Sequence, residues 1–354
     1  MKRIYNVFVL IFLAGALHAQ DINFSQFYEL PLLRNPALAG VFNGDVRFIA
    51  AFRNQWESVP VDYNTTAASL EIRRPSGKYS FWTGGLQFTN DVAGDSRLGK
   101  TQFLPVFAFH QLLNWDYNIF LTAGFSAGYV SQRFDPTNLR FGDQFVNGTY
   151  SRTNPTNAVF ANTSNNYLDL SSGLSLSGEA GYYKYYLGAA YFHFNDPKVA
   201  FSALNDIRLN RKIVFNGGIS FRTSEYGDRL VFYGDYFMQG GNRQFQGGVL
   251  YKKMIYEEYD NENQALSIGC FYRWNDAVVP VLKYQYENWA VGATYDINVS
   301  KLTAASQLRG AFEITLSYKD FLNILRAERY NFDCVPTDPE SGVRRGRPIG
   351  YGRR

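Results

Sequence analysis

The residues able to do acid–base or nucleophilic chemistry are few and far apart in this sequence. Apart from His18 near the amino terminus, the chain has two histidines, His110 and His193, and two cysteines, Cys270 and Cys334. Neither histidine stands beside a serine or cysteine motif that would pair a nucleophile with a base. We therefore expect no catalytic residue and no enzyme activity.

Metal and cofactor sites are not indicated either. No cysteine or histidine pair has the spacing of metal ligands, and two cysteines are too few for a disulfide framework, so we expect both to be unpaired. Paired glycines occur in strand or hairpin patterns and not in a phosphate-binding loop, at Gly84–Gly85, Gly217–Gly218, Gly240–Gly241 and Gly247–Gly248. We predict no cofactor, and we read these glycines as places where strands pack closely, bend or bulge.

Charged residues in alternation with apolar ones are the more informative set. Period-two alternation puts them on one face of extended strands. They are Arg47, Arg53, Glu71, Arg73, Lys212, Arg222, Arg309 and Glu313. Such a face can line a functional polar lumen, or its charges can pair in salt bridges that fill a barrel, and we favour the second.

The elements that carry these charges are about fourteen β-strands between Asp45 and Tyr318. In DVRFIAAF, for example, Val46, Phe48 and Phe52 share one face and Arg47 shares the other with Arg53. Each strand has about ten residues, enough to cross a bilayer when tilted. The expected strands lie near residues 45–54, 63–74, 79–90, 100–111, 117–130, 166–180, 185–194, 212–223, 229–239, 243–252, 266–275, 278–286, 289–297 and 308–318.

Composition agrees with a barrel that faces lipid. Aromatic residues make up 17% of the chain and charged residues only 19%. Residues 1–19 have a basic start, an apolar core and a small residue at Ala19, which is typical of a secretory signal peptide. The net positive charge comes from the two ends of the chain and the strand-rich part between them is close to neutral, so we expect no nucleic-acid partner. The predicted fold is all-β, a transmembrane antiparallel barrel of the outer membrane with a plug-like amino-terminal segment.

The lengths of the links between strands predict the orientation of the barrel. Short links such as PSGK and YYK alternate with longer ones, the longest from Ser131 to Asn165. Bacterial barrels have short periplasmic turns and long outer loops, so we expect both termini in the periplasm. The link KKMIYEEYDNENQ does not fit, because it is long for a periplasmic turn. The expected parts are the signal peptide 1–19, a plug or inner-mouth segment 20–44, the barrel 45–318 and a basic periplasmic tail 319–354.

The stretch FSQFYELPLLRNPALAG does not alternate. Pro31 and Pro36 make it a poor strand because each lacks a backbone donor. Pro36 suits the first turn of a short helix and Gly40 suits its end. Its aromatic and leucine side chains need burial, which a barrel of about fourteen strands offers because its interior is too wide to be filled by its own side chains. We predict that this segment enters the barrel and partly plugs it.

This block also resembles the start of the PorP/SprF family, outer-membrane proteins of the type IX secretion and gliding machinery of Bacteroidetes. The resemblance extends to AFRNQW, to HFNDP at His193–Pro197 and to GAFEITLSY at the last strand, and so spans about Asp21 to Tyr318. The motif residues that we expect to matter are Phe24, Ser25, Gln26, Tyr28, Asn35, Pro36, Gly40, Arg53, Gln55 and Trp56.

The resemblance implies a barrel that helps to export or anchor a cell-surface protein and does not catalyse a reaction. Its partners would be an exported surface adhesin or the adhesin's carboxy-terminal signal domain, periplasmic motor-ring lipoproteins, and outer-membrane lipid. From the residues themselves, a periplasmic partner contact is a separate hypothesis for the tail arginines, Arg344, Arg345, Arg347, Arg353 and Arg354. Two alternatives stay open: a FadL-like carrier of small hydrophobic molecules, and a β-sandwich structural protein.

Overall fold

The computed structural model describes residues 21–55, 63–77, 79–146, 148–158, 160, 162–201, 206–255, 264–300, 309–322 and 339–340. The expected signal peptide, Trp56, Cys334 and the five tail arginines lie outside these residues. Within the described ranges, no helix is both long enough and apolar enough to cross a membrane.

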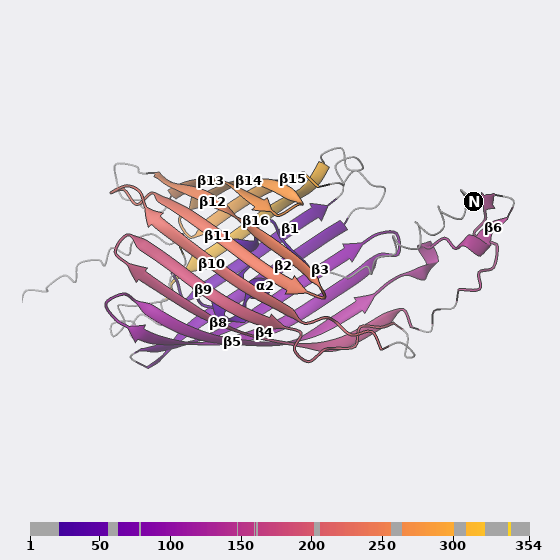
Figure 1. Cartoon of the computed structure of the whole chain (residues 1–354), viewed down its shortest axis with the longest axis horizontal. Helices are drawn as coiled ribbons and strands as arrows, with labels where there is room; N and C mark the ends of the chain where they lie inside the picture. Colours follow the sequence, from indigo (N-terminus) through magenta and orange to yellow (C-terminus); the bar gives the residue numbers. More distant parts are fainter. Residues whose placement is uncertain are drawn as a thin grey trace, which may run out of the picture.

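Fourteen described strands close into one antiparallel barrel, as the alternation predicts (Figure 1). Each strand pairs with its neighbours in chain order, and β1 closes the ring against β16. The strands are β1 (Val46–Gln55), β2 (Tyr63–Gly77), β3 (Ser80–Ala93), β4 (Leu98–Asn114), β5 (Ile119–Arg133), β8 (Ser164–Ala180), β9 (Tyr183–Phe192), β10 (Lys212–Arg222), β11 (Arg229–Gln239), β12 (Asn242–Ile255), β13 (Gln264–Arg273), β14 (Ala277–Tyr286), β15 (Trp289–Asn298) and β16 (Arg309–Asp320).

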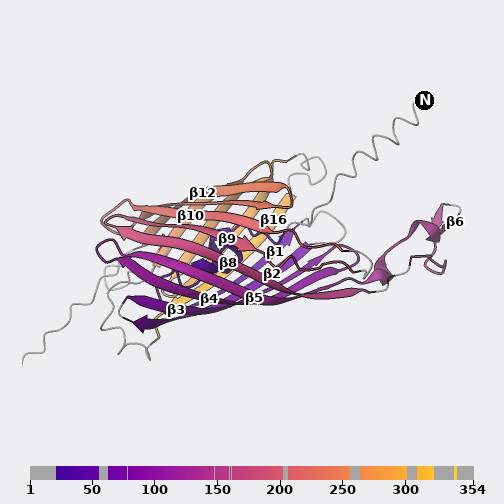
Figure 2. The same cartoon turned by 60° about the horizontal axis from the view of Figure 1, so that its bottom comes forward.

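The two ends of the barrel differ. At one end, here called the turn end, β1 begins, β16 ends, and β2–β3, β8–β9 and β14–β15 are joined by very short turns. At the other, the loop end, the long β5–β8 link carries η3 (Pro136–Asn138), η4 (Gly142–Gln144) and the small hairpin of β6 (Phe145–Val146) and β7 (Thr149–Tyr150). This link projects well beyond the barrel (Figure 2). The link after β12 is shorter than expected, because β12 continues to Ile255.

The two faces of the wall have the reverse of the polarity found in water-soluble proteins. Apolar side chains such as Phe52, Leu70, Phe107, Leu187, Phe215, Leu282 and Ile314 are exposed on the outer face. Charged side chains are buried on the inner face, among them Arg47, Arg53, Glu71, Arg73, Lys212 and Glu313. Since bilayer lipid is the only solvent that favours such an outer band, the wall is built to stand in a membrane.

Before β1, residues 21–44 contain a series of short helical turns. We call these residues the lumenal segment. It contains η1 (Phe27–Glu29), α2 (Pro31–Arg34) and η2 (Pro36–Leu38). A proline occupies the first turn of both α2 and η2, where the missing N–H costs nothing. Asn35 caps η2, its side-chain oxygen accepting from the N–H of Ala37 at 2.8 Å. Figure 1 places α2 within the ring of strands.

Candidate functional site

The candidate site is the lumenal segment together with the inward-facing side chains that hold it. The segment hydrogen-bonds to side chains of β2, β8, β11, β14 and β16, which lie on different sides of the ring. A segment that touches the inner faces of so many strands must lie within the lumen. Its own residues from Phe24 to Phe42 are almost all buried.

One buried ionic cluster holds the first turn of the segment. The Arg53 guanidinium lies 2.8 Å from Asp296 and 3.1 Å from Glu313. Glu313 accepts the backbone N–H groups of Ser25 and Gln26, both at 2.8 Å. Asp296 accepts the Ser25 hydroxyl and pairs with Arg273, which joins β13 to the cluster. These contacts satisfy two backbone donors that would otherwise be buried without partners.

A second cluster holds the end of the segment. Arg47 and Glu71 face each other on β1 and β2 in a two-pronged pair with both distances at 2.8 Å. Glu71 also accepts the N–H of Gly40 at 2.9 Å. Arg73 donates to the carbonyl oxygens of Gly40 and Phe42 at 3.1 and 2.9 Å. Arginine suits this role because its planar fork meets several acceptors at once.

The middle of the segment is held by one ion pair at either side and by aromatic packing. Arg34 makes a two-pronged pair with Asp235 of β11, one of its bonds at 2.7 Å. Glu29 accepts from Lys283 of β14. The Tyr28 ring stacks on Tyr233, with ring centroids 4.9 Å apart and ring planes at 4°. The apolar surface of the segment is therefore buried against an aromatic part of the inner wall.

Glycines in the wall mark where the segment approaches most closely. A Cβ at Gly124 of β5 would lie 2.3 Å from the backbone N of Ala37. A Cβ at Gly173 of β8 would lie 1.9 Å from the side-chain oxygen of Asn35. Both distances are shorter than any real contact, so these strands need glycine for the segment to fit. The paired glycines expected to mark close packing include Gly240–Gly241, which form the two-residue β11–β12 turn with positive φ angles of 55° and 86°.

A third cluster holds the start of the segment at the loop end. Asp21 pairs with His193 at 2.7 Å and Lys100 at 3.0 Å, and His193 bonds Asp169 through its other ring nitrogen at 2.8 Å. Burial alone would lower the pKa of His193, but the carboxylates of Asp21 and Asp169 outweigh it and raise that pKa to about 9. Burial would likewise raise the pKa of Asp21, yet Lys100, His193 and Lys212 hold it well below its ordinary value.

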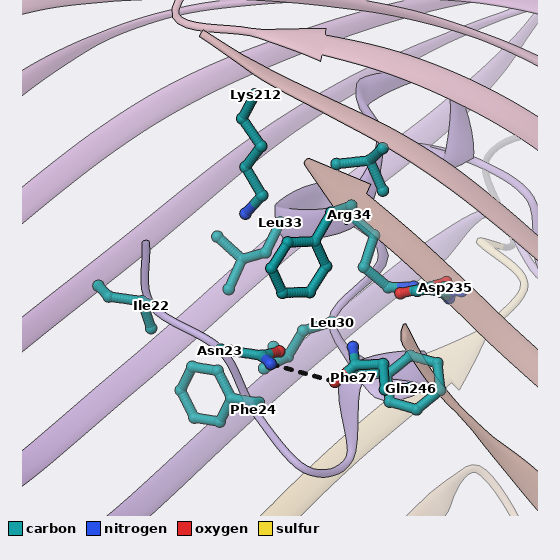
Figure 3. Close-up of a pocket in the computed structure, with 12 residues that line it drawn as sticks. Ile22, Asn23, Phe24, Phe27, Leu30, Leu33, Arg34, Lys212, Asp235 and Gln246 are labelled. Atoms are coloured by element: carbon teal, nitrogen blue, oxygen red, sulfur yellow. Dashed lines mark hydrogen bonds and ion pairs between the residues drawn. The ribbon is translucent and has the colours of Figure 1, made fainter. Parts of the chain in front are cut away.

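Cavities of different sizes adjoin the segment. The cavity between its first turns and strands β10–β12 has a volume of only about 30 Å³, and Asn23 bonds Gln246 across it at 3.1 Å (Figure 3). A larger cavity of about 340 Å³ lies at the loop end, where Arg53, Lys100, Asp276 and Asp296 are among its lining residues. The first could hold about one water molecule, and the second is a polar, charged vestibule.

Most of the expected motif residues come together here. Phe24, Ser25, Gln26, Tyr28, Asn35, Pro36 and Gly40 are buried in the lumenal segment, and Arg53 contacts it from β1. Gln55 lies beside Arg53. With the Gln55 amide turned so that its oxygen faces Arg53, the guanidinium donates to that oxygen. His193 lies just after β9 and not within a strand, in a left-handed conformation with φ of 57°.

Three acidic anchors, Asp169, Asp235 and Asp296, do not stand out in the sequence. Each faces inward from a strand whose neighbouring residues are mostly apolar or aromatic, as in YGDYF and TYDIN. An isolated acid at an inward position is the feature that could have identified them.

One of the expected lumen charges does not contact the lumenal segment. Arg222 instead donates to carbonyl oxygens of its own turn. Among the described residues, no group of three or more His, Cys, Asp or Glu side chains could hold a metal ion.

The fold and site define a membrane-spanning β-barrel with a polar lumen that contains a segment of its own chain. The sequence matches the family described as type IX secretion system membrane protein PorP/SprF over residues 16–318. The chain belongs to this family, as the resemblance of the amino-terminal block indicates. The family is one of secretion-system membrane barrels. No curated protein matches the chain.

Solved structures resemble the chain only at low sequence identity. The toluene transporter TbuX from Ralstonia pickettii has 11% sequence identity and a TM-score of 0.46, covering 83% of this chain and 94% of that one. The monoaromatic hydrocarbon channel CymD has 10% identity and a TM-score of 0.45, covering 83% and 93%. CdiB from Acinetobacter baumannii has 9% identity and a TM-score of 0.40, covering 78% and 60%. None of these likenesses supports an inference about what this chain binds.

Proposed function

We propose that this protein is an outer-membrane component of the type IX secretion and gliding machinery that binds a cell-surface protein and helps to export or anchor it. The observation that carries the proposal is the lumenal segment, which lies in the path that a solute would take. Its three buried ionic clusters hold it along the lumen, and the cavity between its first turns and strands β10–β12 is only about 30 Å³. We infer that it closes the barrel to solutes and leaves protein binding as the main activity.

The long loops supply a surface for such a partner. Phe134 after β5 packs against Phe160 and against Phe201 of the β9–β10 link, with ring centroids 5.2 and 4.9 Å apart. The hairpin at the tip of the β5–β8 link exposes Phe145 and Val146. Exposed apolar residues on an ordered loop are common at protein-binding surfaces. We propose that the loop end binds the exported adhesin or its carboxy-terminal signal domain.

The opposite end would face the periplasm, with the tail arginines near the motor-ring lipoproteins. These arginines would bind acidic partner surfaces through contacts that weaken with salt. A truncated variant that ends at Val343 lacks all five arginines and keeps residues 339–340. If this shortened chain still recovers the lipoproteins in full, the tail has no part in binding them.

The deciding experiment is a mild-detergent pull-down of the tagged protein from native membranes, followed by mass spectrometry. We expect a large adhesin or motor lipoproteins to be recovered. Replacing Phe145 and Val146 with serine should reduce recovery of the adhesin, while Arg152→Lys on the same loop should not. Recovery of the barrel alone, with bound lipid, would instead support the FadL-like carrier. The polar, charged vestibule argues against that alternative, because a small hydrophobic molecule finds few apolar partners there.

A further inference from the structure

A short piece of the chain from beyond the barrel lies in the lumen at the turn end. Pro339 and Glu340 follow β16 in sequence by about twenty residues, yet Glu340 is buried against inward-facing side chains of three strands. Its carboxylate lies 2.7 Å from the Lys283 amine of β14 and accepts the Tyr233 hydroxyl of β11 at 3.1 Å. The lumen therefore contains residues that precede the first barrel strand and residues that follow the last one.

The backbone of this dipeptide is recognised as well as its side chain. Arg229 of β11 donates to the carbonyl oxygen of Pro339 at 3.1 Å. Lys252 of β12 donates to the carbonyl oxygen of Glu340 at 3.0 Å. Three buried cations and one phenol thus converge on one dipeptide, and charge-assisted bonds of this kind are the strong ones. Contacts to both carbonyls and to the carboxylate select a peptide, not a free anion.

The same lysine joins this dipeptide to the lumenal segment. Lys283 pairs with Glu29 of η1 as well as with Glu340. Tyr233 likewise stacks on Tyr28 of the segment while its hydroxyl donates to Glu340. The two pieces of chain therefore share wall residues, and loss of one changes the surroundings of the other.

We infer that the turn end of the lumen is a binding site for a carboxylate-bearing peptide and that its occupant is the chain's own Pro339–Glu340. The site fastens the carboxy-terminal part of the chain to the inner wall and to the lumenal segment. This inference is independent of the proposed function, since it concerns contacts within one chain.

A zero-length carbodiimide coupling of the full-length protein tests it. The reagent takes up the water lost when the Lys283 amine and a carboxylate form an amide. We expect mass spectrometry to find a Lys283–Glu340 link, which disappears in Glu340→Gln and in Lys283→Met. The matched control is Glu225→Gln, which changes an exposed glutamate in the β10–β11 turn at the same end and should leave the link intact.

The Lys283–Glu29 link serves as the internal control, because it shows that the reagent reaches Lys283. If that link forms without the Glu340 link, the inference is overturned. A second measurement decides the outcome if neither link forms. Full-length Glu340→Gln protein is titrated with a labelled peptide of residues 337–342, TDPESG, and with TDPQSG. The glutamate peptide should bind at least about tenfold more tightly, and equal binding would overturn the inference.

Discussion

Phe52 and Arg53 are neighbours on β1, yet they belong to two different environments. Phe52 is 43% exposed on the outer face, whereas Arg53 is 2% exposed in the lumen. Phe52 needs only to be apolar, because lipid accepts any apolar side chain of similar size. Arg53 must match Asp296, Glu313 and Ser25 in position and charge. The outer face is thus specified by composition, and the inner face by individual residues.

The largest expected effect is at Arg53. Arg53→Met removes one cation from a buried cluster and leaves Glu313 without its ion-pair partner. Breaking a buried pair on one side costs about 3–5 kcal/mol of unfolding free energy, measurable by urea unfolding in lipid vesicles. The control is Phe52→Leu on the same strand, which should change stability by at most about 0.5 kcal/mol. Equal losses for the two variants would contradict the difference between the faces.

The reverse substitution tests the outer face. Phe52→Arg places a charge against lipid and should cost more than about 1 kcal/mol, up to the about 2–4 kcal/mol that such a charge costs at the bilayer midplane. The same measurement on Tyr117→Arg, in the β4–β5 turn, should show about 0–1 kcal/mol because that residue is near an end of the barrel. A Phe52→Arg protein as stable as the wild type would mean that this face does not contact lipid.

Two glycines sharpen the comparison without a change in charge. Gly40, in the lumenal segment, has φ of 78°, and a Cβ there would lie 2.1 Å from the Thr83 hydroxyl oxygen. Gly40→Ala should therefore cost about 1–3 kcal/mol. Gly84 on the outer face of β3 has no atom within 4 Å of such a Cβ, so Gly84→Ala should be nearly neutral. Thermal unfolding of both variants measures the difference, which should vanish if the segment does not occupy the lumen.

The smallest effect concerns pH. The pKa of His193 is raised to about 9, so protonation of His193 stabilises the folded protein. This contribution is complete below the unfolded pKa of about 6.5 and is lost as pH rises through about 9. We expect the free energy of unfolding to fall by about 1–2 kcal/mol between pH 8 and 10. In His193→Asn this fall should be reduced, and an unchanged pH profile would show that the histidine is not the group responsible.

The effect of Asp21, in the same cluster, on the free energy of unfolding has the opposite dependence on pH. Its pKa is held well below the ordinary value of 3.8, so its contribution is present above that value and disappears as pH falls further. The arginine cluster at Arg53 and the histidine cluster at the loop end therefore differ in kind. Guanidinium groups keep their charge across this range, whereas the start of the segment is held by a group that titrates.

The sequence predicts the wall well. Strand alternation is local, so the inward position of Arg47, Arg53 and Glu71 and the outward position of Phe48 and Phe52 follow from a period of two. The proline and glycine positions in NPALAG likewise predict a short helix and its end, and η2 is found there. The strand number follows from counting alternating runs between turns, and family membership follows from the amino-terminal block.

The partners of the inner charges could not be predicted from the sequence. Some contacting pairs are about two hundred or more residues apart in the sequence, such as Ser25 with Glu313 and Arg34 with Asp235. They meet only because the barrel closes and the segment lies inside it. The need for glycine at Gly124 and Gly173 likewise depends on where η2 lies in space. The sequence by itself thus determined strands, faces and a non-strand block. Tertiary structure alone decided which charges meet and that Glu340 returns to the lumen, because those contacts depend on distances across the closed ring.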